Sequence, residues 1–236
     1  MTNLLFLAVA VLSLVVPQSA PFVPPADMQT VHVVLLMKGP NAGTGTPAEQ
    51  EQMQMAHVGH LGKLGAAGHA YIAGPMGDNG DLRGIILMKA ASADAAKALE
   101  AEDPAVKADR LRIEVVSYMS PANWFSFKPI PTDIKMRQHV FGYLNVSPAM
   151  AAGTVKMTPE LQMAHLNNLW ALRDSGALIA AGPAQNSATH AGVVIFALDK
   201  IEDARALLEK DPAVKAGLFT IELHPWFAAD RIVTGK

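Results

Sequence analysis

The chain has 236 residues, of which 50% are hydrophobic and 17% are charged, with a formal net charge of −2. This length is enough for one large core or for two of about 90 residues each. The near-neutral charge argues against nucleic acid as a partner, because neutralising phosphates requires a clustered excess of Lys and Arg. There is no cysteine, which excludes disulfides, thiol nucleophiles and cysteine-ligated metal centres.

The N-terminal segment has the character of a signal peptide. Residues 4–16 are an apolar run, shorter than the ~18 residues of a membrane-spanning helix. We therefore expect export to the periplasm or the medium, a signal peptide at residues 1–20, a linker at residues 21–29 and no integral membrane domain. The lack of Lys or Arg before the run, and Pro21 directly after the expected cleavage residue, leave an uncleaved anchor as the alternative.

The rest of the chain repeats itself at a spacing of 108 residues. Residues 31–119 align with residues 139–227 without a gap, and 26 of the 89 pairs are identical. The shared motifs are Gln-Met-Ala-His at 54–57 and 162–165, Ala-Gly-Pro at 73–75 and 181–183, and Asp-Pro-Ala-Val-Lys-Ala at 103–108 and 211–216. A gapless match of this length indicates a tandem duplication. We expect one repeat at 30–119, a linker at 120–138 and a second repeat at 139–230.

The hydrophobic pattern of each repeat predicts the order β-α-β-β-α-β. The first repeat begins with a strand at residues 31–37. The pattern is clearest in the second repeat, where it predicts strands at 140–146, 177–181, 192–198 and 219–223, one helix after the N-cap Thr158, and another at 201–209. This is the ferredoxin-like α+β arrangement, whose sheet has one bare face. Two such sheets can bury their bare faces together, so we expect an intramolecular dimeric α+β barrel in a monomeric chain.

Only two of the eight histidines, His57 and His165, occupy equivalent positions in the repeats. Each lies on the apolar stripe of the first helix, where it is either a buried structural histidine or a general acid–base. Asp103 and Asp211 are the candidate partners, because a carboxylate fixes the tautomer of a catalytic histidine. Each also precedes a proline, as the N-cap of a short helix would. The spacing leaves both roles open.

No metal site and no cofactor are expected. His57 and His60 are three residues apart on one helix face, but the second repeat has Asn168 at the second position and no third ligand is indicated. The glycine-rich residues 39–46 lack the Lys-Ser/Thr of a phosphate-binding loop and are expected to form a loop near the site.

A few further residues are candidates for contact with a substrate. Gly74 and Gly182 of the Ala-Gly-Pro motifs would let the backbone approach it. On the last strand of the repeats, the candidates are Arg112, Glu114 and Glu222. The two glutamates line the space between the sheets or are solvated edge charges.

The last strands differ between the repeats. Arg110 and Arg112 of the first repeat stand opposite Leu218 and Thr220 of the second. A site in the first repeat would therefore be the more basic and would favour an anion, although decay of one site is equally compatible with this difference.

The motifs at His165, Gly182-Pro183 and Asp211, together with Ile-Glu-Leu-His-Pro-Trp at 221–226, resemble the YCII-related (YciI-like) family. The resemblance covers both repeats, about 180 of the 236 residues, although the first repeat has Ser-Tyr at 117–118 in place of Pro-Trp. It implies a ferredoxin-like fold, assembly as a dimeric α+β barrel, and a His–Asp pair. These pairs would be His165 with Asp211 and His57 with Asp103. Most members have no assigned reaction, and one is a dehydrochlorinase acting on a chlorinated hydroxyquinone.

The sequence therefore predicts an exported enzyme that uses cofactor-free acid–base chemistry on a small organic molecule, in an elimination or an isomerisation. The histidines would move the proton, and the aspartates would orient the imidazole rings. The alternative is a non-catalytic ligand-binding or structural protein, in which the histidines belong to the core and the aspartates are only helix caps.

Overall fold

The computed structural model describes residues 23, 25–124, 135–185 and 187–230. The first repeat contains β1 (Met28–Lys38), α1 (Pro47–Ala66), β2 (Ala70–Pro75), β3 (Leu82–Met88), α2 (Ala93–Glu100), α3 (Pro104–Lys107) and β4 (Leu111–Pro121). After the short 3-10 helix η1 (Ala122–Trp124), the second repeat contains β5 (Met136–Val146), α4 (Pro148–Ala151), α5 (Pro159–Asp174), β6 (Leu178–Gln185), β7 (His190–Phe196), α6 (Ile201–Leu208), α7 (Pro212–Lys215) and β8 (Phe219–Ala229). The order β-α-β-β-α-β is confirmed in both repeats. The expected signal peptide lies outside the described residues, and within them no helix is long and apolar enough to cross a membrane.

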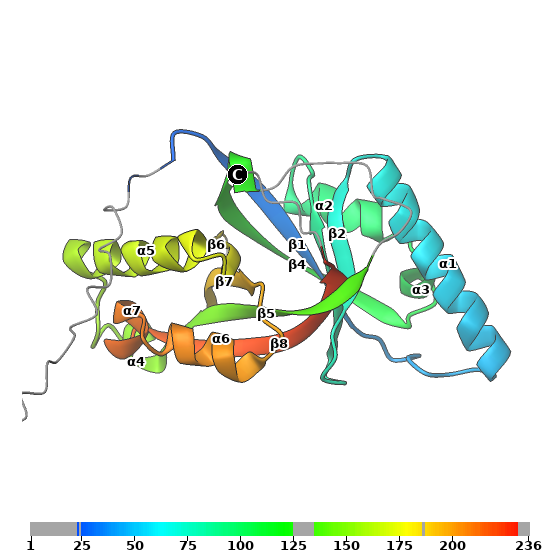
Figure 1. Cartoon of the computed structure of the whole chain (residues 1–236). Coiled ribbons are helices and arrows are strands. Elements are labelled where there is room, and N and C mark those ends of the chain that lie inside the picture. Colours follow the sequence, from blue (N-terminus) through cyan, green and yellow to red (C-terminus); the bar gives the residue numbers. More distant parts are fainter. Residues whose placement is uncertain (1–22, 24, 125–134, 186, 231–236) are drawn as a thin grey trace, which may run out of the picture.

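The strands of both repeats form one sheet in the order β2-β3-β1-β4-β6-β7-β5-β8. β4 and β6 pair where the repeats meet, with Tyr118 opposite Ala184. The two outer strands also meet, through a bridge between Met76 and Trp226, which are the repeat equivalents of that pair. The predicted intramolecular α+β barrel is therefore confirmed, with the helices of the two repeats on opposite sides of the strands (Figure 1).

Alternation along the strands divides the apolar side chains between two environments. Val33 and Leu35 of β1 belong to a core that draws buried residues from both repeats, including Phe141 and Trp226. Their neighbours in β1 face the helices of the first repeat, in a separate core formed by Val34, Leu36, Leu64, Ala70, Ile86, Met88 and Ala96. This period of two is the reason that one strand serves both the barrel interior and the helix layer.

The first helices of the two repeats begin at different points. Thr158 caps α5 as predicted, and its hydroxyl accepts a hydrogen bond from the backbone N–H of Leu161. The equivalent of Thr158 is Gln50, yet α1 already begins after Thr46, which forms a capping box with Glu49. α1 is therefore one turn longer at its N-terminus. The short helix α4, which precedes α5, was not predicted.

The strands extend into the segments predicted as linkers. β4 continues through Pro121 and β5 begins at Met136, so both ends of the 120–138 linker belong to strands. β1 begins at Met28, within the 21–29 linker. The pairing of β1 with β4 extends from Met28 opposite Pro121 to Lys38 opposite Leu111, which explains why these strands continue past the apolar runs.

Candidate active site

The structure brings each histidine of the shared motif into contact with the aspartate of its own repeat. His57 on α1 places Nδ1 2.6 Å from Oδ2 of Asp103, the N-cap of α3. His165 on α5 places Nδ1 2.9 Å from each carboxylate oxygen of Asp211, the N-cap of α7. The two pairs occupy equivalent positions, so the packing of a long helix against a short one creates the same contact twice.

Both aspartates are fully buried and also cap a helix. Oδ1 of Asp103 accepts a hydrogen bond from the N–H of Ala105 at 2.7 Å, and Oδ1 of Asp211 accepts one from Ala213 at 2.9 Å. Burial tends to raise the pKa of Asp103, but the hydrogen bond from His57 and the backbone bond outweigh it and hold that pKa below its usual value. Capping and contact with histidine, which the sequence left as alternatives, therefore coexist.

This geometry determines where the imidazole protons lie. A carboxylate can only accept hydrogen bonds, so Nδ1 of each histidine carries a proton, and in the neutral ring Nε2 carries the lone pair. Within the described residues, Nε2 of His57 and of His165 has no hydrogen-bond partner, and both histidines line cavities. Each Nε2 is therefore available to a ligand as a base, or as an acid once protonated.

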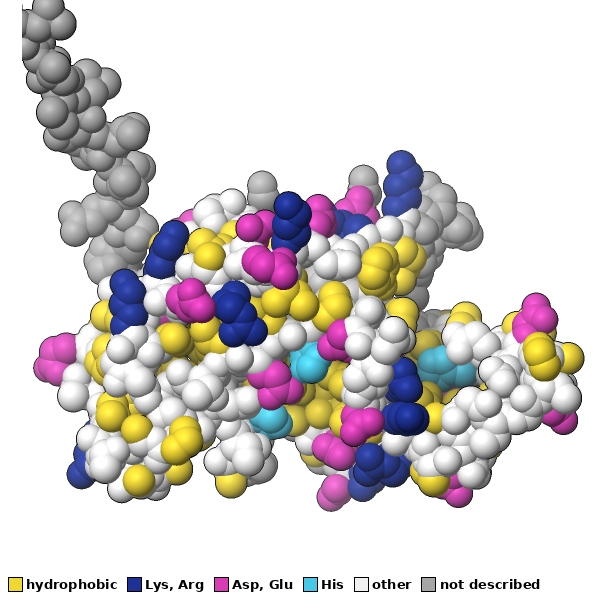
Figure 2. Space-filling model, turned by 90° about the horizontal axis from the view of Figure 1, so that it is seen from below, with side chains coloured by type: hydrophobic (Ala, Val, Ile, Leu, Met, Phe, Trp, Pro, Cys, Tyr) yellow, Lys and Arg dark blue, Asp and Glu magenta, His cyan; other side chains and the backbone are white. Residues whose placement is uncertain are grey.

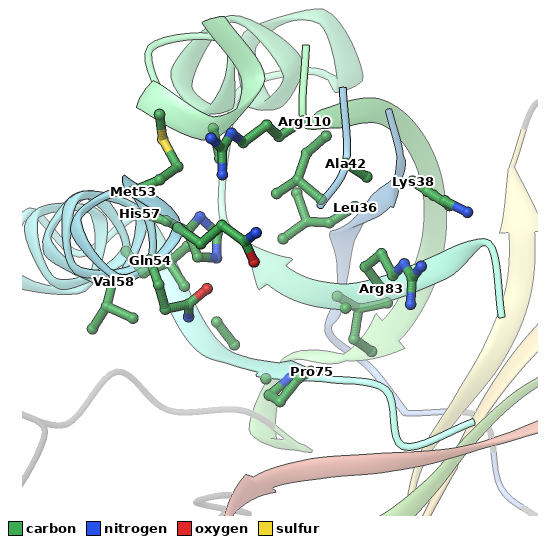
Figure 3. A pocket seen from close by; sticks show the side chains of 18 of the residues that line it. Leu36, Lys38, Ala42, Met53, Gln54, His57, Val58, Pro75, Arg83 and Arg110 are labelled. Atoms are coloured by element: carbon green, nitrogen blue, oxygen red, sulfur yellow. The ribbon is translucent and has the colours of Figure 1, made fainter. Parts of the chain in front are cut away.

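The two cavities are equivalent in position and unequal in size. The first, of about 660 Å³, lies between α1 and the strands of the first repeat (Figure 3). The second, of about 230 Å³, lies between α5 and the strands of the second repeat. Leu36 and Leu61, which pack on the helix side of the sheet, line the first cavity. The cavities are thus on the helix-bearing faces of the sheet, outside the barrel core.

Each cavity is also lined by the other repeat, which contributes one residue to the first cavity and several to the second, including Met119 and Pro121 of β4. Met136, at the start of β5, lines the first cavity, and Met28, at the start of β1, lines the second. These two methionines are themselves repeat equivalents. Neither cavity is complete within a single repeat.

Gly74 and Gly182 line the first and the second cavity, and the seam between the repeats explains why they are glycines. A Cβ at Gly74 would lie 1.8 Å from the carbonyl oxygen of Phe227, and one at Gly182 would lie 1.7 Å from that of Met119. Trp226 Nε1 donates a hydrogen bond to the carbonyl oxygen of Gly74 at the same seam. The glycine of each Ala-Gly-Pro motif is therefore needed for the close approach of the strands at this seam, whatever its contact with a ligand.

The other expected contact residues lie elsewhere. Arg112 is exposed, and its Nε donates to the carbonyl oxygen of Lys38 at 3.2 Å; Arg110 lines the first cavity in its place. Glu114 is exposed and lines neither cavity. Glu222 also lines neither cavity. It lies opposite Tyr143 of the shared core, on the barrel side of the sheet, and takes part in a polar network.

That network connects the two repeats and was not predicted. His224 lies between Oδ2 of Asp78, at 2.7 Å from Nδ1, and Oε1 of Glu222, at 3.1 Å from Nε2. Asn145 Nδ2 donates to Glu222 at 2.7 Å, and Oδ1 of Asn145 lies 2.6 Å from Nδ1 of His190. Burial opposes ionisation of Glu222, but the hydrogen bonds from His224 and Asn145 lower its pKa. Figure 2 shows histidines, carboxylates and apolar side chains meeting between the halves on one face of the molecule.

A buried carboxyl group lies beside the first pair and has no counterpart beside the second. Glu100 is fully buried at the end of α2, and among the described residues neither of its oxygens has a hydrogen-bond partner. Nε2 of His60 is 3.3 Å from Oε2 of Glu100 without the alignment of a hydrogen bond. Burial, together with the charge of Asp103, raises the pKa of Glu100 to about 9. Burial therefore favours the protonated, neutral form of Glu100.

These groups also raise the question of a metal ion. Ligand atoms of His57, Glu100 and Asp103 lie within 4.8 Å of one another. Two ligands about 2.05 Å from a tetrahedral ion would be about 3.3 Å apart. The 2.6 Å between His57 and Asp103 is shorter and fits a shared proton.

Solved structures place this fold among α+β barrel proteins. A mutant chlorite dismutase from Candidatus Nitrospira defluvii, in complex with cyanide, is 8% identical with a TM-score of 0.56, covering 84% of this chain and 90% of its own. A heme-binding protein from Thermus thermophilus is 14% identical with a TM-score of 0.50, covering 87% and 94%. A 5-chloro-2-hydroxyhydroquinone dehydrochlorinase from Burkholderia phenoliruptrix is 17% identical with a TM-score of 0.28, covering 36% and 89%.

No curated protein matches the sequence. The sequence model of the YCII-related domain matches residues 30–120 and 146–226, which together make up most of the chain. The chain therefore belongs to the YCII-related domain family, of which it carries two tandem copies.

Proposed function

We propose that this protein is an enzyme that transfers protons in small organic molecules without a cofactor, using His57 and His165 as acid–bases. Asp103 and Asp211 act as positioning residues. One observation carries the proposal: a histidine whose Nδ1 is bonded to a buried carboxylate, and whose Nε2 is free at a cavity, occurs in both repeats.

The reaction follows from the lone pair on Nε2. It accepts a proton from an acidic C–H bond of the bound molecule. In an elimination, the electron pair of that bond forms a C=C bond as a leaving group departs from the neighbouring carbon with its own bonding pair. In an isomerisation, the electron pair forms a C=C bond to a neighbouring carbonyl carbon while the C=O π pair moves onto oxygen, and the imidazolium then returns the proton to another atom of this enolate. The carboxylate stabilises the imidazolium while it exists. Proton transfer of this kind contributes typically about 10²- to 10⁴-fold to a rate.

The fold relatives are consistent with a role in small-molecule chemistry, since they are named for chlorite dismutation and for heme binding. A ligand between the helix and the sheet would also contact the backbone at Gly74 or Gly182, which line the cavities.

The competing function is ligand binding without catalysis, or a purely structural role. It is favoured by the caps on α3 and α7, because each His–Asp bond also secures a short helix in the fold. In that case the histidine would contribute stability and no turnover.

Deuterium exchange distinguishes the two functions. The folded chain is incubated in D₂O with a panel of small carbonyl compounds, lactones and halogenated hydroquinones, and loss of C–H signals or appearance of products is followed by NMR. We expect at least one compound to exchange or react with the wild-type chain and not with His57→Ala/His165→Ala. His69→Ala is the matched control. It introduces the alanine found at the equivalent position of the second repeat, and it should keep full activity. Equal rates in the double variant and the wild type would overturn the proposal in favour of a structural role.

Export is part of the proposal and is supported by the apolar run at residues 4–16. The enzyme would then act as a monomer whose two sites belong to one barrel.

A further inference from the structure

We propose that the first cavity binds small organic anions bearing a carboxylate or phosphate group, whereas the second binds neutral apolar molecules. This deepens the proposed function by naming the substrate class at His57, and it rests on that function only for the turnover of the anion.

Three cationic side chains line the first cavity: Lys38, Arg83 and Arg110. The topology brings them to one end of the sheet. β1 ends at Lys38, which pairs with Leu111, the residue after Arg110, and the N–H of Lys38 bonds the carbonyl oxygen of Asp81, two residues before Arg83. Among the residues that the structure describes, no aspartate or glutamate lines this cavity.

The cations are also free of ion pairs. Within the described ranges, no carboxylate oxygen lies within 4.0 Å of the charged nitrogens of these three residues. Glu49 is close enough to Arg110 for the charge of Arg110 to contribute to the lowered pKa of Glu49, but that carboxylate is bonded to the N–H and hydroxyl of Thr46. Unpaired positive charges around a recessed site raise the local concentration of anions.

The arrangement suits an anion held beside the base. Figure 3 shows His57 and Gln54 on the α1 side of the cavity, with Arg110 above them and Arg83 across the cavity in this view. A guanidinium donates two parallel hydrogen bonds to a carboxylate or phosphate. An anion anchored there would leave the rest of the molecule next to Nε2 of His57.

The second repeat supplies an internal comparison. The equivalents of Lys38, Arg83 and Arg110 are Val146, Ala191 and Leu218, so all three charges are absent. The described lining of the second cavity contains no lysine, arginine, aspartate or glutamate, and it includes Trp170 and Phe219. Both cavities contain the histidine and the glycine of the shared motifs. They differ in the side chains that would recognise a ligand.

Binding of matched probes tests the inference. Benzoate and phenyl phosphate are titrated into the full chain by calorimetry and by amide-shift NMR, with benzyl alcohol as the neutral probe. We expect both anions to shift amides around the first cavity, and benzyl alcohol to shift those around the second. Arg110→Leu and Arg83→Ala, which introduce the residues of the second repeat, should each weaken anion binding tenfold or more. Arg110→Lys keeps the positive charge but loses the paired N–H donors of the guanidinium, so it should weaken anion binding less than Arg110→Leu does.

Arg112→Thr is the matched control. It also removes one positive charge, but from a side chain that lies two residues from Arg110 and outside the cavity. It should change the anion affinity less than twofold. A loss of affinity equal to that of Arg110→Leu would mean that only the net charge of the protein matters, and it would overturn the inference. Anion shifts around the second cavity would also overturn it. Thermal melts verify that each variant is folded. His57→Ala should keep anion binding within a few fold while it loses turnover of the anion. Turnover that persists in His57→Ala with binding intact refutes the proposed function alone, and turnover by the wild-type chain without anion binding refutes this inference alone.

Discussion

Glu100 and Leu208 occupy the same position in the two repeats, and both side chains are fully buried. The folded chain holds a carboxyl group in the first repeat where the second holds an alkyl group. Because the buried pKa is about 9 against 4.5 for the unfolded group, the unfolded state loses its proton long before the folded state does. The free energy of unfolding should therefore fall as the pH rises through the neutral range, because the unfolded state gives up the proton that the folded state retains.

Replacing Glu100 by Leu should remove this contribution to the pH dependence of the free energy of unfolding. We expect Glu100→Leu, combined with His60→Asn to match the second repeat, to raise the free energy of unfolding at pH 8 by a few kcal/mol and to flatten its pH dependence. Urea denaturation at pH 5, 7 and 8 measures both. Glu102→Gln, at an exposed neighbour, should leave the slope unchanged; an unaltered slope in the double variant would mean that Glu100 ionises normally.

Asp211→Asn should separate capping from proton chemistry. An asparagine oxygen can still accept from the N–H of Ala213, so the cap and the melting temperature should be retained. Its amide nitrogen would donate to Nδ1 of His165 and move the ring proton to Nε2, which removes the base. We expect turnover at this site to fall by about 100-fold or more. Asp211→Ala should in addition lose about 0.5–2 kcal/mol of stability.

Gly182→Ala should weaken the seam between the repeats. The new Cβ would lie 1.7 Å from the carbonyl oxygen of Met119, so β4 and β6 would have to separate. We expect a loss of about 2 kcal/mol or more in urea denaturation. Gly59→Ala is the control: it lies within α1 with no atom within 4 Å of its added methyl, and should stabilise the chain by about 0.5–1 kcal/mol.

Export can be tested by expressing the full chain with its own N-terminus in a bacterial host. We expect a periplasmic product whose intact mass corresponds to an N-terminus at Pro21. A full-length product in the membrane fraction would instead support the uncleaved anchor, and a full-length product in the cytosol would contradict export altogether.

The fold was predictable because the duplication provides two independent readings of one pattern. Periodicity placed the strands, and the Thr-Pro and Asp-Pro pairs marked the starts of α5, α3 and α7. The closed barrel followed from the bare sheet faces. What the pattern did not contain was α4 and the ends of the strands, because pairing with a neighbouring strand extends a strand beyond its apolar run.

The residues of the candidate site were predictable only where the repeats agree. His57, His165 and their aspartates are shared, so the alignment revealed them. Glu100 lies at the end of α2, where a charged residue is normally exposed to solvent. Only the packing of the folded chain shows that it is buried.

Differences between the repeats were harder to interpret. Both Arg110 and Arg112 differ between the repeats. Arg110 lies directly before β4 and lines the cavity, whereas Arg112, within β4, does not. His190 and His224 correspond to Leu82 and Val116, so a search for shared residues passes over them.

The exchange of Met28 and Met136 between the cavities has a consequence for how this molecule can change. In a homodimer of single repeats, every substitution occurs in both subunits, so the two sites stay identical. Here the two repeats are joined in one chain. Each cavity can therefore acquire its own ligand-contacting side chains while the other repeat still lines part of it. Arg110 lines the first cavity, and the residue at its position in the second repeat is Leu218, so the two halves have already diverged here. One chain thus contains two cavities with chemically different linings.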